Sequence, residues 1–267
     1  MREILFHPGF HRTGTSSIQH FLWRNHESLA PHVQLMMLRH LKPVVRLCAH
    51  FSTTKNPLDL LEMYELLDTA FTERALPDTN NLIISCEGLS GHMPGRNGVD
   101  DYSAAPLLIQ YFVSYLQERF PDARVRLILS TRDSESWLRS VYRYQLRATR
   151  LTLDEDTFVA RFAKVADFDT LLSDIATLLE ETEVLFLPLE EAKNLSSGPG
   201  GALIQQIELP TFLRQSLVTV SAGNEGPDAA MQAEFLRLNQ SELGNSEVAT
   251  LKQGLAEKVN LGAWKKT

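Results

Sequence analysis

Apolar and polar positions along this chain follow two periods, which predict strands in some segments and helices in others. Short apolar runs bounded by turn residues indicate buried strands, whereas apolar residues three and four positions apart indicate helices. The apolar runs predict strands at 3–7, 81–86, 124–131 and 183–187, with 33–38 either a strand or a loop. Helical spacing predicts helices at 14–27, 57–75, 103–119, 133–150, 154–180 and 228–241.

The order of these elements predicts an α/β fold. Strands separated by helices need crossover connections, which give a parallel central sheet with helices on both faces. The 267 residues are enough for one large domain, so we expect a single domain over 1–267. Its C-terminal part, from about residue 196, is expected to be mainly helical, with Ser-Ser-Gly-Pro-Gly-Gly at 196–201 as a loop or flexible insertion.

The segment 7–22 joins the first predicted strand to the first predicted helix. A strand that turns sharply into a helix presents backbone N–H groups there, and the helix dipole makes the turn favourable for an anion. Gly9 and Gly14 permit positive φ, and Arg12 supplies a forked cationic donor. Hydroxyl groups come from Thr13, Thr15, Ser16 and Ser17. The segment predicts a site for a phosphate-like or sulfate-like group; the alternative is an ordinary turn with glycines for backbone reasons.

The cation of this loop distinguishes it from a nucleotide-triphosphate P-loop. That motif, G-x-x-x-x-G-K-[ST], uses its lysine on the β- and γ-phosphates and its hydroxyl on Mg²⁺. Gly9 and Gly14 have the same separation, but Thr15 stands at the lysine position and the loop's cation is Arg12. The sequence therefore argues against ATP or GTP hydrolysis. It implies no metal, because the histidines and cysteines also lack metal-ligand spacing.

Residues 127–144 predict a second strand, turn and helix. Arg132 and Asp133 end the strand, where ligands bind in open α/β sheets, and Ser140 and Tyr142 follow in the helix. These residues predict a second anion site at the same edge of the sheet. The alternative is a charged helix start with a structural salt bridge, since charged helix starts are common.

Together, the two segments resemble the cofactor loops of sulfotransferases that use 3′-phosphoadenosine 5′-phosphosulfate (PAPS). The first resembles their 5′-phosphosulfate loop, with Arg12 where most members have lysine. The second resembles their 3′-phosphate motif, with Ser134 in place of the usual proline. The resemblance covers about one tenth of the chain. It implies a P-loop NTPase-like sulfotransferase architecture, with PAPS as cofactor and adenosine 3′,5′-bisphosphate (PAP) as product. The implied cofactor-binding residues are Arg12, Thr13, Gly14, Thr15, Ser16, Ser17, Arg132 and Ser140.

Two further segments resemble the family more weakly. Residues 184–193 resemble its late strand and acidic turn, with Leu189 where many members place a tyrosine near the adenine. Residues 260–266 resemble a segment that closes over the nucleotide in cytosolic members, through Trp264 and Lys265. The alternative for Trp264 is a terminal side chain that packs on a helix.

Sulfuryl transfer is an in-line displacement that depends on positioning and electrostatic stabilisation. The resemblance implies that Arg12 stabilises charge on the transferring group, which an arginine does only as an electrostatic donor. Glu87 follows a buried strand at the sheet edge and is the predicted general base. His92 and His11 are the alternative bases. The structural alternative for Glu87 is a carboxylate that pairs with a loop cation or caps a helix.

Composition restricts the partners and the compartment. The net charge of −7 disfavours nucleic-acid binding by the whole surface, so an anionic cofactor needs local positive charge. Arg139, Arg143 and Arg147 lie at four-residue spacing and give either an anion-attracting patch or a surface paired with acidic neighbours. The cysteines Cys48 and Cys86 cannot build a disulfide framework. No apolar run reaches membrane-span length and the first strand begins at once, so we expect a cytoplasmic protein without a signal peptide.

Three hypotheses for function follow. The first is a PAPS-dependent sulfotransferase that acts on a hydroxyl or amine of a carbohydrate or small metabolite. The second is a P-loop-like nucleotide kinase, which the missing lysine disfavours. The third is a protein that binds a nucleotide or sulfated ligand without catalysis. The sequence does not identify the acceptor or the oligomeric state.

Overall fold

A five-stranded parallel sheet forms the centre of the computed structural model, which describes residues 1–74, 80–96, 98–220, 226–259 and 261. The strand order is β2-β3-β1-β4-β5, and every pairing is parallel. The strands are β1 (Arg2–His7), β2 (Val33–Met37), β3 (Asn81–Ser85), β4 (Ala123–Thr131) and β5 (Glu183–Pro188). The predicted α/β class and parallel sheet are therefore confirmed.

Helices fill the connections between these strands. The α-helices between β1 and β4 are α1 (Thr15–Arg24), α2 (His26–Leu29), α3 (Leu38–Thr54), α4 (Leu58–Arg74) and α5 (Ala105–Arg119). Those that follow are α6 (Ser134–Ala148), α7 (Glu155–Phe162), α8 (Phe168–Leu178), α9 (Leu189–Ala192), α10 (Gly198–Ile204), α11 (Thr211–Ser216), α12 (Ala229–Gln240) and α13 (Asn245–Lys258). Two 3₁₀ helices are η1 (Glu87–Ser90) and η2 (Ala163–Ala166). Within the described ranges, none of the helices has the length and apolar composition needed to cross a membrane.

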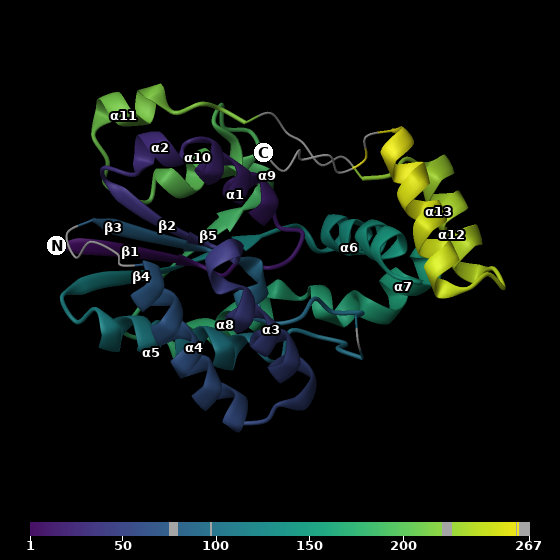
Figure 1. The fold of residues 1–267 in the computed structure, drawn as a ribbon, viewed down its shortest axis with the longest axis horizontal. Coiled ribbons are helices and arrows are strands. Elements are labelled where there is room, and N and C mark those ends of the chain that lie inside the picture. The colour runs from purple at the N-terminus through teal and green to yellow at the C-terminus, as the bar shows by residue number, and fades with distance from the viewer. Residues whose placement is uncertain (75–79, 97, 221–225, 260, 262–267) are drawn as a thin grey trace. The chain divides into compact units, whose positions relative to one another are not determined.

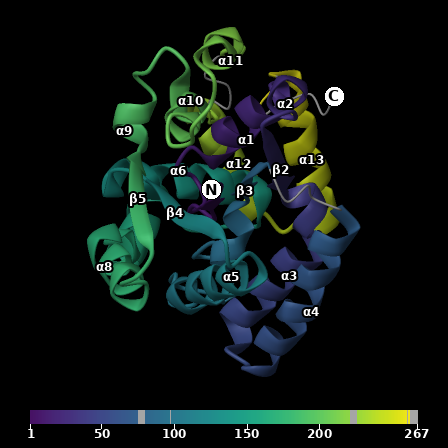
Figure 2. The same ribbon diagram turned by 90° about the vertical axis from the view of Figure 1, so that its left-hand side faces the viewer.

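The chain divides into two compact units, and the first contains the sheet. This unit comprises Met1–Asp133 and Asp167–Val220. Helices cover both faces of its sheet: α1, α2 and α10 lie on one face, and α3, α4, α5 and α8 on the other (Figures 1 and 2). Alternate residues of β1 point to opposite faces, so Leu5 joins the core beside α1, whereas the ring of Phe6 lies 5.6 Å from that of Phe112 on α5. The apolar runs of the strands are thus buried on both faces, as parallel sheets require.

The second unit is built from helices. It comprises the described residues of 134–166 and 221–267 and contains α6, α7, α12 and α13. Its core includes an aromatic cluster in which the ring of Phe158 on α7 lies 5.5 Å from that of Tyr142 and 4.7 Å from that of Phe162. The expectation of a single domain over the whole chain stays a prediction.

One expected loop is instead a helix. The segment 196–201 was expected to be a loop or flexible insertion, but α10 begins inside it, at Gly198. Pro199 lies in the first turn, where proline is tolerated because its missing N–H needs no partner. Gly200 is buried where a Cβ would overlap Phe21 of α1, so the glycines allow two helices to pack closely. Packing therefore overrides the weak helix propensity of this composition.

Candidate functional site

The carboxyl ends of β1, β3 and β4 meet at one edge of the sheet, and His7 joins them. His7 ends β1 and lies beside Ser85 of β3 in the strand register. Its Nδ1 lies 2.9 Å from Oγ of Ser85, and its Nε2 lies 3.2 Å from Oγ of Ser130 in β4. Burial lowers the pKa of His7 to about 4, so the ring is neutral near pH 7. A neutral, buried histidine therefore connects three strands at the start of the loop that follows β1.

The loop between His7 and α1 has an unusual backbone. Gly9, Arg12 and Gly14 have φ values of 59°, 69° and 95°. This left-handed region costs a residue such as arginine about 1–2 kcal/mol, and strain of this kind often occurs at functional sites. A Cβ at Gly9 would lie 2.7 Å from Cγ2 of Thr15, so the loop turns back too closely for any side chain there. The two glycines of the motif therefore both serve the turn that the sequence predicts.

Hydroxyl groups hold this loop against the sheet. Oγ1 of Thr13 donates to the carbonyl oxygen of Phe10 at 2.7 Å and lies 2.7 Å from Oγ of Ser130. Oγ of Ser90 donates to the carbonyl oxygen of Gly9 at 2.6 Å. Thr13 is buried, so its hydroxyl stabilises the loop conformation from within.

The first turn of α1 carries the remaining predicted binding residues. Gly14 is the N-cap, and no side chain of the described residues caps the helix there. The backbone N–H of Ser17 donates to the carbonyl oxygen of Gly14 at 3.0 Å. Thr15 is buried, whereas Ser16 and Ser17 are partly exposed. The start of α1 therefore keeps the dipole and backbone donors that favour an anion.

Arg132 lies beside this loop. Its Nη1 donates to the carbonyl oxygen of Arg12 at 3.2 Å, which connects the residue after β4 to the centre of the loop. Two predicted cofactor arginines are thus brought together. Leu189, the first residue of α9, lies next to Gly14, where a Cβ would come within 2.8 Å of its Cδ1. In the first unit, Arg132 and Leu189 therefore lie beside the loop that contains Arg12.

Glu87 begins η1, shortly after the end of β3, and the residue is partly exposed. Nε2 of Gln19 on α1 donates to Oε2 of Glu87 at 2.5 Å. Burial lowers the pKa of His11 and raises that of Tyr102; the charge of Glu87 opposes the first shift and adds to the second, so the carboxylate lies near both side chains. The predicted base therefore lies beside the predicted anion loop, with one oxygen oriented by an amide.

His11, an alternative base, contacts a buried tyrosine. Its backbone N–H donates to Oη of Tyr102 at 3.1 Å, and its Nδ1 lies 3.1 Å from the same oxygen. Burial lowers the pKa of His11 to about 4; Glu87 opposes this shift, whereas His92, Arg96 and Arg12 add to it. Burial and Arg96 also lower the pKa of His92, the other alternative base.

Ser140 lies on α6 of the second unit and is buried. Arg132 belongs to the first unit, so the pairing of Arg132 with Ser140 on one phosphate stays a prediction. Arg139 on the same helix forms ion pairs with Glu135 at 3.0 Å and Glu155 at 3.1 Å. This pairing favours the interpretation of Arg139 as part of an acid-paired surface.

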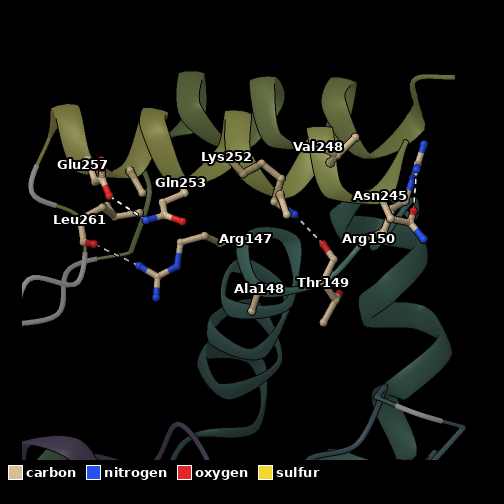
Figure 3. A pocket seen from close by; sticks show the side chains of 12 residues that line it. Arg147, Ala148, Thr149, Arg150, Asn245, Val248, Lys252, Gln253, Glu257 and Leu261 are labelled. Carbon is tan, nitrogen blue, oxygen red and sulfur yellow. Dashed lines mark hydrogen bonds between the residues drawn. The ribbon is translucent and has the colours of Figure 1, made fainter. Parts of the chain in front are cut away.

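A pocket of about 880 Å³ lies in the second unit, between the end of α6 and α13 (Figure 3). Its buried Lys252 donates to the carbonyl oxygens of Leu146 and Thr149 at 2.7 and 2.6 Å. Arg147 donates to the carbonyl oxygen of Leu261 at 3.2 Å. These cations bind carbonyl groups of the chain, including those at the end of α6, where positive charge is stabilising. We therefore interpret them as structural. Trp264 and Lys265 of the predicted closing segment lie outside the described residues.

Comparison with models of known protein families and with curated protein sequences finds no match to this chain. The candidate site therefore rests on its geometry. The contacts of His7, Gln19, Ser130 and Tyr102 were not among the sequence predictions. Ser130 and Tyr102 lie about 120 and 90 positions beyond the residues they contact, at a separation where no local pattern pairs them.

Proposed function

We propose that this chain transfers a sulfuryl group from PAPS to a hydroxyl or amine of a carbohydrate or small-metabolite acceptor. The observation that carries the proposal is the hydrogen bond from Arg132 to the carbonyl oxygen of Arg12. It brings a cation from the end of β4 to the anion loop of β1. PAPS has two separated anionic ends, a 5′-phosphosulfate and a 3′-phosphate, whereas a nucleoside triphosphate needs only the first site.

The residues of the first unit are suited to this cofactor. The uncapped start of α1 offers backbone donors to the 5′ end, and Arg12 adds a forked charged donor. Arg132 lies beside the same loop and is the residue assigned to the 3′-phosphate, and Leu189 provides an apolar contact beside Gly14. Arginine at position 12 stabilises the spread negative charge of the transition state without losing its proton.

Glu87 supplies the base in the proposed reaction. Its carboxylate accepts the proton of the acceptor's hydroxyl or amine while the acceptor's oxygen or nitrogen bonds to sulfur. The bond between sulfur and the bridging oxygen of the 5′-phosphate breaks, so PAP leaves with the electron pair of that bond. Gln19 keeps one carboxylate oxygen oriented by its hydrogen bond. No metal is required by this account.

Titration calorimetry with PAP and with ATP, both without Mg²⁺, tests the proposal. We expect PAP to bind and to raise the melting temperature, because a ligand at one hundred times its dissociation constant stabilises a fold by about 2.7 kcal/mol. We expect ATP to bind far more weakly. A separate titration with ATP–Mg²⁺ tests the kinase hypothesis, which would be supported if ATP–Mg²⁺ bound as tightly as PAP. PAP binding without sulfuryl transfer to any acceptor would support the non-catalytic hypothesis.

A pair of variants controls this experiment. Arg132→Ala removes the cation assigned to the 3′-phosphate, so it should weaken PAP binding more than binding of adenosine 5′-phosphosulfate, which lacks that phosphate. Arg237→Ala removes an exposed arginine that pairs with Glu234 on α12, and it should leave both affinities unchanged.

A further inference from the structure

The contact between His11 and Tyr102 has a chemical consequence for the proposed reaction, on which this inference rests. We propose that Tyr102 donates its hydroxyl proton to Nδ1 of His11 and thereby holds His11 as the neutral Nε2–H tautomer, so that His11 is a hydrogen-bond donor to the sulfuryl group or acceptor and not the base. Tyr102 is then a positioning residue, and Glu87 remains the base.

The geometry of the contact supports this arrangement of protons. Oη of Tyr102 accepts the backbone N–H of His11 at 3.1 Å and lies 3.1 Å from Nδ1 of the same residue. In this arrangement the phenol oxygen accepts the backbone N–H of His11, and the phenol's own proton is donated to Nδ1. Each of the two hydrogen bonds then has its own proton. The other ring nitrogen, Nε2, then carries the proton of the neutral imidazole.

Packing fixes the phenol in place. Tyr102 is 4% exposed, and its ring lies 5.0 Å from the ring of Phe10. The ring of Phe10 in turn lies 5.3 Å from that of Phe168, so the tyrosine is part of an aromatic cluster. Burial and the charge of Glu87 raise the pKa of Tyr102 far above its ordinary value, so the phenol keeps its proton.

The charges around His11 also favour a neutral ring. Arg12 in the loop, and Arg96 and His92 beyond η1, oppose a positive charge on His11, whereas Glu87 on η1 favours one. Burial is the largest influence and also opposes a positive charge, so the pKa of His11 is lowered to about 4. A neutral imidazole with a pKa this low is a poor proton acceptor at pH 7 but a competent donor through N–H.

Two substitutions at position 11 separate a donor from a base. The amide of His11→Gln places an N–H donor near the position of Nε2, whereas that of His11→Asn reaches only the position of Nδ1. If Nε2–H stabilises the transition state, the Gln variant should keep turnover within about tenfold, and the Asn variant should lose about 10²–10³-fold. If His11 is the base, both variants should lose activity equally, and the proposal is wrong.

Tyr102→Phe tests the positioning role. Without the phenol, Nδ1 of His11 loses the donor that favours its neutral form, so the pKa of His11 should rise, although burial, Arg12, Arg96 and His92 still hold it below its ordinary value. PAP binding by this variant should then tighten as pH falls from 7 to 5, since His11 gains a positive charge beside an anionic ligand. The wild type should not show this extra increase in PAP affinity. Because PAP itself also titrates, the two proteins are compared at each pH, so that the titration of PAP cancels. Identical pH profiles would overturn the role of Tyr102. Tyr115→Phe is the matched control, because the buried hydroxyl of Tyr115 has no hydrogen-bond partner in the described part of the chain.

The tautomer can be read directly in the free protein. Long-range ¹H–¹⁵N NMR spectra, with the His11 signals assigned from His11→Gln, should show a neutral Nε2–H ring at pH 7. An Nδ1–H or charged ring would overturn the inference even if the enzyme is active. If the wild type neither binds PAP nor transfers a sulfuryl group, the proposed function fails, while the spectra still decide the tautomer.

Discussion

Glu87 combines two features at the scale of a single residue: it is partly exposed, and a hydrogen bond orients one of its carboxylate oxygens. A general base needs both, because it must reach the acceptor's proton and must hold its geometry. The structure gives this carboxylate a hydrogen bond from the amide of Gln19, and the structural alternatives, a pair with a loop cation or a helix cap, stay predictions. The contact with Gln19 is therefore the one to preserve when the basicity of Glu87 is tested.

Glu87→Gln removes the basicity and keeps the size and an oxygen that accepts from Gln19. If Glu87 is the base, turnover should fall about 10²–10⁴-fold. PAP affinity should stay the same or rise slightly, because a negative charge near an anionic ligand is lost. Rate assays and calorimetry on one preparation check both points, with a melting curve to show that the variant is folded. Full activity would remove Glu87 from the mechanism.

Arg12 combines a functional charge with a left-handed backbone at φ 69°. Arg12→Ala and Arg12→Gly both remove the guanidinium, but only glycine adopts this conformation without strain. The Gly variant should therefore unfold with a free energy about 1 kcal/mol higher than the Ala variant. Both should bind PAP about equally weakly, with a loss of about 1.5–3 kcal/mol for a hydrogen bond to a charged group. Urea unfolding and calorimetry measure the two effects separately; equal stability of the variants would show that the backbone is unstrained.

The sequence predicts the residues of the loop but not the network that supports them. Gly9, Arg12 and Gly14 are visible because their spacing is local. The bonds from His7 to Ser85 and Ser130 depend on which strands are neighbours in the sheet, and the sequence pattern does not state that order. A buried histidine at a strand end is the only local sign of the network.

At the scale of the elements, apolar runs identify strands well because both faces of this sheet are covered. The segment 33–38, either strand or loop by pattern, forms β2 at Val33–Met37, with four of its five residues buried. Helices are harder to predict where composition and packing disagree. The pattern predicts no element over 39–56, yet α3 runs through this segment and contains Pro43.

The contact between α1 and α10 provides a test at this scale. Gly200→Ala would place a Cβ against Phe21, so we expect the free energy of unfolding to fall by about 1–3 kcal/mol, as for other overpacked sites. Gly254→Ala is the control: Gly254 lies within α13 with open space around its Cα, so alanine should stabilise by about 0.5–1 kcal/mol. Denaturant unfolding of both variants measures the difference. Two stabilised variants would show that close helix packing does not explain the glycine.

At the scale of the whole molecule, the sequence predicts a parallel sheet with helices on both faces because the alternation of elements requires crossovers. It does not predict a division into two units, since α6 and α7 leave the first unit and the chain returns at residue 167. The chain crosses a third time after Val220, where the sequence is rich in glycine, but no glycine or proline marks the crossings at 133 and 167. Such units are defined by contacts between segments that are distant in the sequence. Sequence periodicity cannot predict them, because it reports only on local structure.

The stability of the whole fold should depend on pH in part through the buried His7. The pKa of His7 is about 4 in the folded chain and about 6.5 when unfolded, so below pH 6.5 the unfolded chain binds a proton that the folded chain does not. The contribution of His7 is fully present above pH 6.5 and is lost as pH falls toward 4, by about 3 kcal/mol in total.

Urea unfolding between pH 4.5 and 7.5 should therefore show a free energy of unfolding that rises with pH. His7→Gln should reduce this slope by about one proton, or roughly 1.4 kcal/mol per pH unit near pH 5. His32→Gln, which removes a partly exposed histidine, controls for the loss of an imidazole. The same slope in the wild type and in His7→Gln would show that His7 is not the group that titrates.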